Sequence, residues 1–238
     1  MDPLVLLHGF PDTPRTWELA RPALERHHDV LAPALPLGED LVPDTVRLLD
    51  EAGIERAHFA GNSLGGWLAL KLATLDRALS VTAFAPGGGW RPGDGIFERA
   101  LAEQADLLEF APRLAPHADA TVATSEGRRR ATRLISVRYQ HIPPDVLADQ
   151  LRFVASCGPE LLDVARRHDW SLDAAAIRCP VRIVWGTEDV LLPWPGAAAR
   201  FREEWLPHAD WVVLDDVGHC PQLDVPLEAA QLILGMTT

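Results

Sequence analysis

Short, mostly apolar runs that alternate with helical patterns constrain the fold of this chain more than any other feature. Because these runs lack a regular apolar–polar alternation, helices should cover both faces of the sheet that they form. Strands alternating with helices favour βα units, and therefore an α/β fold with a doubly wound, mostly parallel sheet of about six strands. The expected strands are Leu4–Leu7, Val30–Ala34, His58–Ala60, Val81–Ala85, Val181–Trp185 and Val212–Leu214.

Helical patterns fill most of the gaps between these runs. Asp44 is a suitable N-cap for one helix, and Gly53 is a suitable residue just beyond its end. Pro226 fits the first turn of the last helix. The expected helices of this part of the chain are Thr16–Arg26, Thr45–Ala52, Leu64–Leu75, Ala197–Trp205 and Pro226–Leu234.

One long stretch, from about Gly87 to Arg178, contains no convincing strand. Roughly 90 residues are far more than a single crossover requires. We therefore expect a core of residues 1–88 and 178–238, interrupted by a helical insertion at residues 89–177, here called the cap segment. The alternative is a set of ordinary crossover helices. The helices expected in the cap segment are Ile96–Phe110, Gly127–Gln140, Pro144–Ser156 and Glu160–His168.

Length and charge limit the classes of protein that fit. A chain of 238 residues suits one large domain with an insertion. The net charge of −12 argues against nucleic acid or an anionic membrane as a partner, since both attract basic surfaces. No apolar run approaches the ~20 residues of a membrane span. The first residues lack the basic start of a secretory signal, and three widely spaced cysteines make disulfides unlikely, so we expect a cytoplasmic protein.

The strongest local signal is Gly61-Asn62-Ser63-Leu64-Gly65-Gly66. It follows one expected strand and opens the next helix, which is the context of a G-x-S-x-G nucleophile turn. The turn must lift the Ser63 hydroxyl above the sheet, so side chains at positions 61 and 65 would collide with the neighbouring strand and helix. The alternative interpretation is a chance glycine-serine turn.

A serine nucleophile needs a base, and the base needs an acid that fixes its tautomer. His219 follows the last expected strand, where its loop should reach the carboxyl edge of the sheet. Asp189 follows the strand before it, which gives the chain order serine, acid, histidine. Glu188 is a competitor for the acid. The pair Asp215-Asp216 is another, although it lies too near His219 along the chain to approach it comfortably.

An oxyanion hole would complete this machinery. The first strand runs into His8-Gly9-Phe10-Pro11, and a turn there can aim the backbone N–H of Phe10 at the same point as that of Leu64. Each such donor is typically worth ~3 kcal/mol of barrier. We expect His8 to hold this loop through hydrogen bonds and not to act as a base.

With these four motifs in order, the chain resembles the α/β-hydrolase-fold enzymes that carry a helical cap, and the resemblance covers nearly the whole chain. It implies Ser63 as nucleophile, Asp189 as acid and His219 as base, with Phe10 and Leu64 donating backbone N–H groups. It also implies that the cap segment is a mobile cap over the site. The chain departs from the family by starting at the strand that carries the His-Gly turn, without the usual preceding hairpin.

That departure should leave Val30–Ala34 at an exposed edge of the sheet, where Pro33 and Pro36 lack the N–H for further pairing. An exposed edge allows a homodimer without demanding one, so a monomer and a homodimer are both open. Similar enzymes often carry an aspartate and a glycine-rich turn after this strand, whereas this chain reads Ala34-Leu35-Pro36-Leu37-Gly38. Substrate access at this edge is therefore expected to differ.

Other residues near the expected site have weaker signals. Trp90 and Trp194 lie close to loops that should face the site and are candidates for substrate contact, although core packing is the commoner fate of tryptophan. Cys220 should be a small buried hydrophobe. Arg128-Arg129-Arg130 should form a solvated helix face, with binding of an anionic substrate group as the alternative. No histidine pair has metal-ligand spacing, so we expect neither a metal nor a cofactor.

The sequence therefore predicts a cofactor-free serine hydrolase that acts on a carboxylic ester or related acyl compound as its small-molecule substrate. The same three residues could instead hydrolyse a C–C bond in a vinylogous diketone, open a lactone, hydrolyse a thioester or catalyse perhydrolysis. Aspartate-nucleophile relatives, the dehalogenases and epoxide hydrolases, are disfavoured because position 63 is serine. A binding module with a residual triad is the non-enzymatic alternative.

Overall fold

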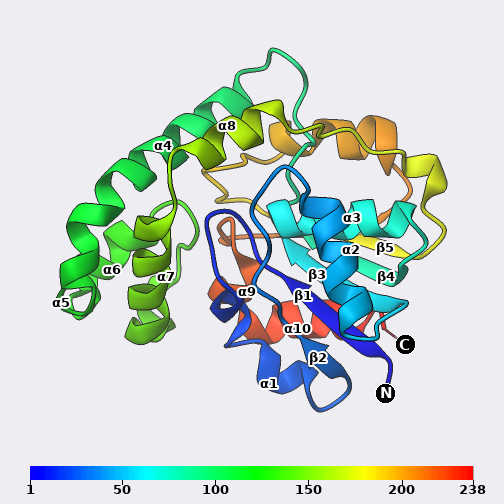
Figure 1. Ribbon diagram of the computed structural model, residues 1–238, viewed down its shortest axis with the longest axis horizontal. Coiled ribbons are helices and arrows are strands. Elements are labelled where there is room, and N and C mark those ends of the chain that lie inside the picture. Colours follow the sequence, from blue (N-terminus) through cyan, green and yellow to red (C-terminus); the bar gives the residue numbers. More distant parts are fainter. Residues whose placement is uncertain (238) are drawn as a thin grey trace.

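The computed structural model describes residues 1–237 and contains a six-stranded sheet in the order β2-β1-β3-β4-β5-β6 (Figure 1). Every neighbouring pair is parallel. The prediction of an α/β fold with about six strands is therefore confirmed. The strands are β1 (Pro3–Leu7), β2 (Asp29–Leu31), β3 (Ala57–Asn62), β4 (Ala78–Phe84), β5 (Val181–Gly186) and β6 (Asp210–Leu214).

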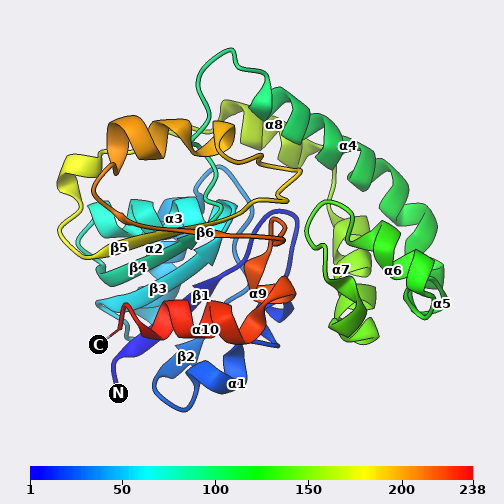
Figure 2. The ribbon, with the colours of Figure 1, turned by 180° about the vertical axis from the view of Figure 1, so that it is seen from behind.

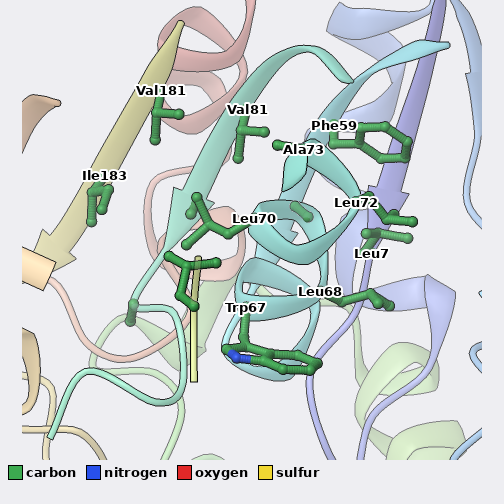
Figure 3. Packing of buried hydrophobic residues seen from close by; sticks show 14 of the residues in the cluster. Leu7, Phe59, Trp67, Leu68, Leu70, Leu72, Ala73, Val81, Val181 and Ile183 are labelled. Carbon is green, nitrogen blue, oxygen red and sulfur yellow. The ribbon is translucent and has the colours of Figure 1, made fainter. Parts of the chain in front are cut away.

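Successive residues of each strand pack into different helical layers. On one face, Val5 and Leu7 belong to the same buried cluster as Trp67 and Leu68 of α3 (Leu64–Thr74), as Figure 3 shows for part of that cluster. On the other face, Leu4 and Leu6 pack with residues of α1 (Arg21–Leu24) and α10 (Pro226–Leu234). Both faces of the sheet thus pack against helices, which explains why most residues of its strands are apolar.

The edge strand β2 pairs only with β1 and has three residues. Its position at the edge was predicted, but the predicted length, Val30–Ala34, was wrong because pairing stops at Leu31. Pro33 follows almost at once and has no N–H for the ladder, which is the physical reason for the early end.

Two predicted core helices were wrong in their bounds. The range Thr16–Arg26 is split into a 3₁₀ helix (Pro14–Trp17) and α1, and a proline within the first two positions of each piece explains why each starts anew. Helix α2 spans Leu41–Glu51, so Asp44 lies in its first turn and is not the N-cap. Gly53 does follow the helix with φ 70°, a conformation that favours glycine.

The predicted helix Ala197–Trp205 is helical in the structure and ends at Trp205, but it is not a regular α-helix. A 3₁₀ turn (Gly196–Ala198) precedes a π-helical turn (Phe201–Trp205) in this region. By contrast, α10 begins and ends where the sequence predicted, at Pro226 and Leu234. A short helix, α9 (Pro221–Asp224), which the sequence pattern did not reveal, follows His219 directly.

The cap segment contains five α-helices, which extend away from one end of the sheet (Figures 1 and 2). Helix α7 has its predicted bounds, whereas the predicted helix Gly127–Gln140 was wrong because α6 ends at Ala131 and irregular chain follows. The helices are α4 (Ile96–Leu114), α5 (Ala118–Val122), α6 (Ser125–Ala131), α7 (Pro144–Ser156) and α8 (Glu160–Arg167).

A third buried cluster lies within the cap segment. Leu101 and Leu108 of α4 pack with Leu147 and Leu151 of α7. The same cluster includes Cys220 from the core, so the apolar interior of the cap segment is continuous with the loop that carries His219. Across residues 1–237, no helix combines the length and the apolar character needed to cross a membrane.

Candidate active site

Ser63 occupies a strained turn between β3 and α3, with φ 56° and ψ −115°. Such a conformation is costly for a residue with a side chain and is concentrated at functional sites. The turn is crowded: a Cβ atom on Gly61 would lie 2.1 Å from the carbonyl oxygen of Gly65, and one on Gly65 would lie 2.2 Å from that of Leu7. Both contacts are with backbone, so only glycine allows the strand and the helix to approach this closely.

His219 and Asp189 form a buried pair. The Nδ1 atom of His219 lies 2.7 Å from Oδ2 of Asp189, whose side chain is 0% exposed. The other carboxylate oxygen of Asp189 accepts hydrogen bonds from the backbone N–H groups of Leu191 at 3.0 Å and Leu192 at 2.8 Å. These donors hold the carboxylate in place, whereas the competitor Glu188 is exposed. Of the two acids, the structure brings Asp189 to the histidine.

The second ring nitrogen of His219, Nε2, is buried and has no hydrogen-bond partner among the described residues. His219 and Ser63 both line one cavity of about 560 Å³, which lies between the core and the cap segment. A histidine held at Nδ1 by a carboxylate has Nε2 free to exchange a proton with a group in that cavity. Among the described residues, Nε2 makes no hydrogen bond with the Ser63 hydroxyl, so the serine–histidine proton transfer stays a prediction.

The loop after β1 lies against the serine. A Cβ atom on Gly9 would be 3.3 Å from the Cβ atom of Ser63. His8 holds the loop as predicted, because its Nδ1 lies 2.8 Å from the carbonyl oxygen of Gly9 and its Nε2 accepts from the N–H of Leu35 at 3.0 Å. Burial lowers the pKa of His8 to about 4, so its ring stays neutral and suits this structural task. Phe10 borders the cavity together with Ser63.

Asn62 is a site residue that the sequence reasoning did not assign. Its side-chain Nδ2 donates to the backbone oxygen of His219 at 2.9 Å and to that of Phe84 at 3.2 Å. Its Oδ1 accepts from Gln222 Nε2 and Cys220 Sγ, each at 3.1 Å. Asn62 therefore ties the serine turn to the histidine loop. Its place beside the nucleophile within the motif was the available signal.

Asp12 is a second residue that sequence reasoning missed. It is buried, it lines the same cavity as Ser63, and its Oδ1 accepts from the N–H of Thr13 at 2.7 Å and from Gln150 of the cap segment at 3.2 Å. Burial raises the pKa of this carboxyl to about 7. The effect of burial is larger than the opposite effects of its hydrogen bonds and of nearby His219, which lower the pKa. Only its position just after the His-Gly turn could have pointed to it.

The remaining candidates lie in different places. Trp90 lines a smaller cavity, of about 80 Å³, that also contains Ser63 and Leu64. Trp194 lines neither cavity; its ring lies 6.3 Å from that of Trp185 and stacks near the guanidinium of Arg202. Cys220 is buried, and burial raises the pKa of its thiol well above the usual range, in keeping with the expected inert residue.

The fold and this arrangement point to a known class of enzymes, and a family model described as the alpha/beta hydrolase family matches residues 4–232. The chain therefore belongs to the alpha/beta hydrolase family, as the motifs of the sequence predicted.

Individual proteins that are named for different activities are similar to the chain. An epoxide hydrolase, EphH, of Mycobacterium tuberculosis is 32% identical over 79% of this chain and 88% of its own length. A pimeloyl-[acyl-carrier protein] methyl ester esterase of Aromatoleum aromaticum is 29% identical over 97% of this chain and 96% of its own. A solved structure of a 2-hydroxy-6-oxo-6-phenylhexa-2,4-dienoate hydrolase from a Rhodococcus strain has a TM-score of 0.74 at 21% identity, covering 99% of this chain and 90% of that one.

Proposed function

We propose that this protein is a cofactor-free serine hydrolase that cleaves a carboxylic ester through an acyl-enzyme on Ser63. The observation that carries the proposal is the buried His219–Asp189 pair. The Nε2 atom of His219 has no hydrogen-bond partner among the described residues, and His219 lines the same cavity as the strained Ser63. Family membership supports hydrolysis in general. The serine supports an ester or related acyl substrate, since a hydroxyl nucleophile attacks a carbonyl carbon.

In the proposed mechanism, His219 takes the Ser63 proton as the serine oxygen attacks the carbonyl carbon. The backbone N–H groups of Phe10 and Leu64 hold the oxyanion, and Asp189 stabilises the imidazolium. The C–O bond to the alcohol then breaks, and His219 gives its proton to the leaving oxygen. Water attacks the acyl-enzyme, again with His219 as the base, which releases the acid and returns the proton to Ser63.

We further propose that the cap segment, residues 89–177, covers this site. Supporting this, Gln104 and Leu107 of α4 and Leu147 and Leu151 of α7 line the cavity that contains Ser63. Gln104 also donates from Nε2 to the carbonyl oxygen of Phe10 at 3.2 Å, so the cap segment contacts the loop that would supply an oxyanion donor.

An assay with p-nitrophenyl acetate, comparing the native protein with Ser63→Ala, tests the proposal. We expect the substitution to reduce kcat by at least about 10⁴-fold, because the nucleophile is lost. Equal turnover by both proteins would rule out the serine mechanism. An organophosphonate should label Ser63 alone, as mapped by peptide mass spectrometry, and labelling at another residue would move the nucleophile.

Styrene oxide is a useful second substrate, since the similar protein EphH is described as an epoxide hydrolase. The epoxide hydrolases of this fold are relatives with an aspartate nucleophile, and position 63 is serine here. We therefore expect no diol from styrene oxide under conditions in which p-nitrophenyl acetate is cleaved. Diol formation that survives Ser63→Ala would overturn the assignment of the reaction.

A further inference from the structure

Two cavities meet at Ser63, and they differ in which catalytic groups they contain. His219 lines the larger cavity, of about 560 Å³, and not the smaller one. Leu64 lines the smaller cavity, of about 80 Å³, and not the larger one. Ser63 and Phe10 line both. The two cavities are therefore separate branches of one site, with the nucleophile at the junction.

This asymmetry orients an ester. In the tetrahedral intermediate, the carbonyl carbon bears the serine oxygen, the oxyanion, the acyl substituent and the leaving oxygen. The leaving oxygen must receive its proton from Nε2 of His219, so it must lie on the histidine side. That side opens into the larger cavity. With the oxyanion at the N–H groups of Phe10 and Leu64, the acyl substituent is left the other opening at Ser63, which is the smaller cavity.

The smaller cavity limits the acyl group to a short chain. Its volume is about 80 Å³, against about 560 Å³ for the larger cavity, so it suits the shorter half of the ester. Its aromatic wall is packed against itself: the rings of Trp90 and Phe97 stack at 4.7 Å, and those of Trp90 and Trp170 lie 5.3 Å apart. Because these rings support each other, the wall cannot easily move outward to admit a longer chain.

The larger cavity suits a long apolar alcohol. Apolar side chains, among them Leu107, Leu147 and Leu151, line it together with polar ones such as Asp12 and Gln150. Its volume lies within the range of about 300–1,000 Å³ that is usual for ligand pockets. It also borders Phe110, which is 52% exposed, so this branch reaches the surface of the cap segment. A long alkyl group would be buried near the serine and could extend toward solvent.

We infer that the preferred substrates are esters of a short carboxylic acid, acetic to butyric, with an aliphatic alcohol of about eight carbons or more. The inference rests on the proposed function and deepens it by assigning each half of the ester to a cavity. It also orders the two chemical steps in space: the alcohol leaves through the larger cavity, and the water that hydrolyses the acyl-enzyme enters on the same, histidine side.

Octyl acetate and methyl nonanoate provide a matched test, because they are isomers that differ only in which half of the ester is long. We expect kcat/KM for octyl acetate to be at least about tenfold higher, since each poorly placed methylene group costs about tenfold or more. Equal values, or a preference for methyl nonanoate, would overturn the inference. The same holds if neither isomer is cleaved while p-nitrophenyl acetate still is. Loss of p-nitrophenyl acetate turnover itself would refute the proposed function instead.

Two variants test each branch separately. Ala131→Phe narrows the larger cavity, and we expect it to lower the ratio of kcat/KM for octyl acetate over ethyl acetate about tenfold. The matched control is Ala123→Phe, at an exposed cap position that lines neither cavity, which should leave that ratio unchanged. If both variants lower the ratio equally, the larger cavity is not the alcohol site.

Val164→Ala widens the smaller cavity at a half-buried position. We expect it to raise kcat/KM for ethyl hexanoate relative to ethyl acetate, by about threefold to tenfold, while leaving the preference between octyl and ethyl acetate in place. If Val164→Ala instead raises kcat/KM for esters of longer alcohols and not for those of longer acids, the assignment of the two cavities would be reversed.

Discussion

The core and the cap segment contribute different parts of the candidate site. In the core, catalytic positions follow from backbone geometry: Ser63 lies where β3 meets α3, and Asp189 and His219 lie in loops that follow β5 and β6. The cap segment contributes no member of the proposed triad, but its residues, from α4, α7 and the chain between them, line most of the larger cavity.

The two regions meet through buried polar contacts as well as apolar ones. Asp224 of α9 accepts from Gly218 N at 2.7 Å in the histidine loop and from Ser136 Oγ at 2.5 Å in the cap segment. On the opposite side of the cavity, Asp12 accepts from Gln150 of α7. Under the proposed function, this difference means that the core sets the type of reaction and the cap segment sets the substrate, with Asp12 and Asp224 linking the two.

The largest effect is expected for a change confined to the core. Asp189→Asn should lower kcat by about 10⁴-fold, because an amide cannot stabilise the imidazolium and favours the wrong tautomer of His219. Steady-state kinetics with p-nitrophenyl acetate measure this effect. The stability of the fold should change much less than the rate.

Glu188→Gln is the matched control, since Glu188 is the exposed neighbour that the sequence left open as the acid. We expect its kcat to stay within about twofold of the native value, as for most surface substitutions. A comparable loss in both variants would mean that the acid role does not belong to Asp189 alone.

The predictability of the core and the cap segment differs for a physical reason. The six strands could be predicted because a parallel sheet buried on both faces favours apolar residues at most positions. Ser63 could be proposed as the nucleophile because its turn excludes side chains at Gly61 and Gly65, which leaves a visible motif. In both cases a local steric requirement restricts the residue types at neighbouring positions, so the sequence shows it.

The cap segment lacks such requirements, so its details were harder to predict. Helix α7 was found because its apolar face is regular, but α6 ends at Ala131, and the chain shortly after it contacts a distant segment, where Ser136 donates to Asp224. The roles of Asp12 and Asp224 were invisible for the same reason: Asp12 bonds to Gln150, and Asp224 bonds to Ser136, which is 88 positions away in the chain. The sequence around an aspartate does not indicate a hydrogen-bond partner that lies far away in the chain and comes close only in the folded structure.

An intermediate effect is expected where the two regions are joined at Asp224. Its carboxylate accepts from Ser136 Oγ, from Gly218 N and from the backbone N–H groups of Val137 at 3.1 Å and Arg138 at 2.9 Å. Asp224→Ala should lower the free energy of unfolding by about 3–5 kcal/mol, because it leaves several donors without partners, two of them on buried residues. For a chain of this size, Tm should fall by on the order of 10 °C in a thermal melt.

Asp215→Ala removes an exposed carboxylate from the chain just before the histidine loop and serves as the control. It should change the free energy of unfolding by no more than about 0.5 kcal/mol. If Asp224→Ala is equally mild, the link between the cap segment and the histidine loop does not depend on this carboxylate.

The smallest effect is expected at Asp12, and it should depend on pH. The pKa of Asp12 is about 7 in the folded chain, against an ordinary value near 3.9 in an unfolded one, so the folded state retains a proton that the unfolded state releases. Stability from this group is complete below about pH 4 and is lost as the pH rises through about 7. The side chain at position 12 cannot titrate in Asp12→Asn. The free energy of unfolding of this variant should therefore rise relative to that of the native protein by about 2–3 kcal/mol as the pH goes from about 5 to 8. Urea unfolding at the two pH values measures the change, with exposed Asp215→Asn as the control; a difference between native and variant that stays constant with pH would show that burial against the cap segment does not raise this pKa.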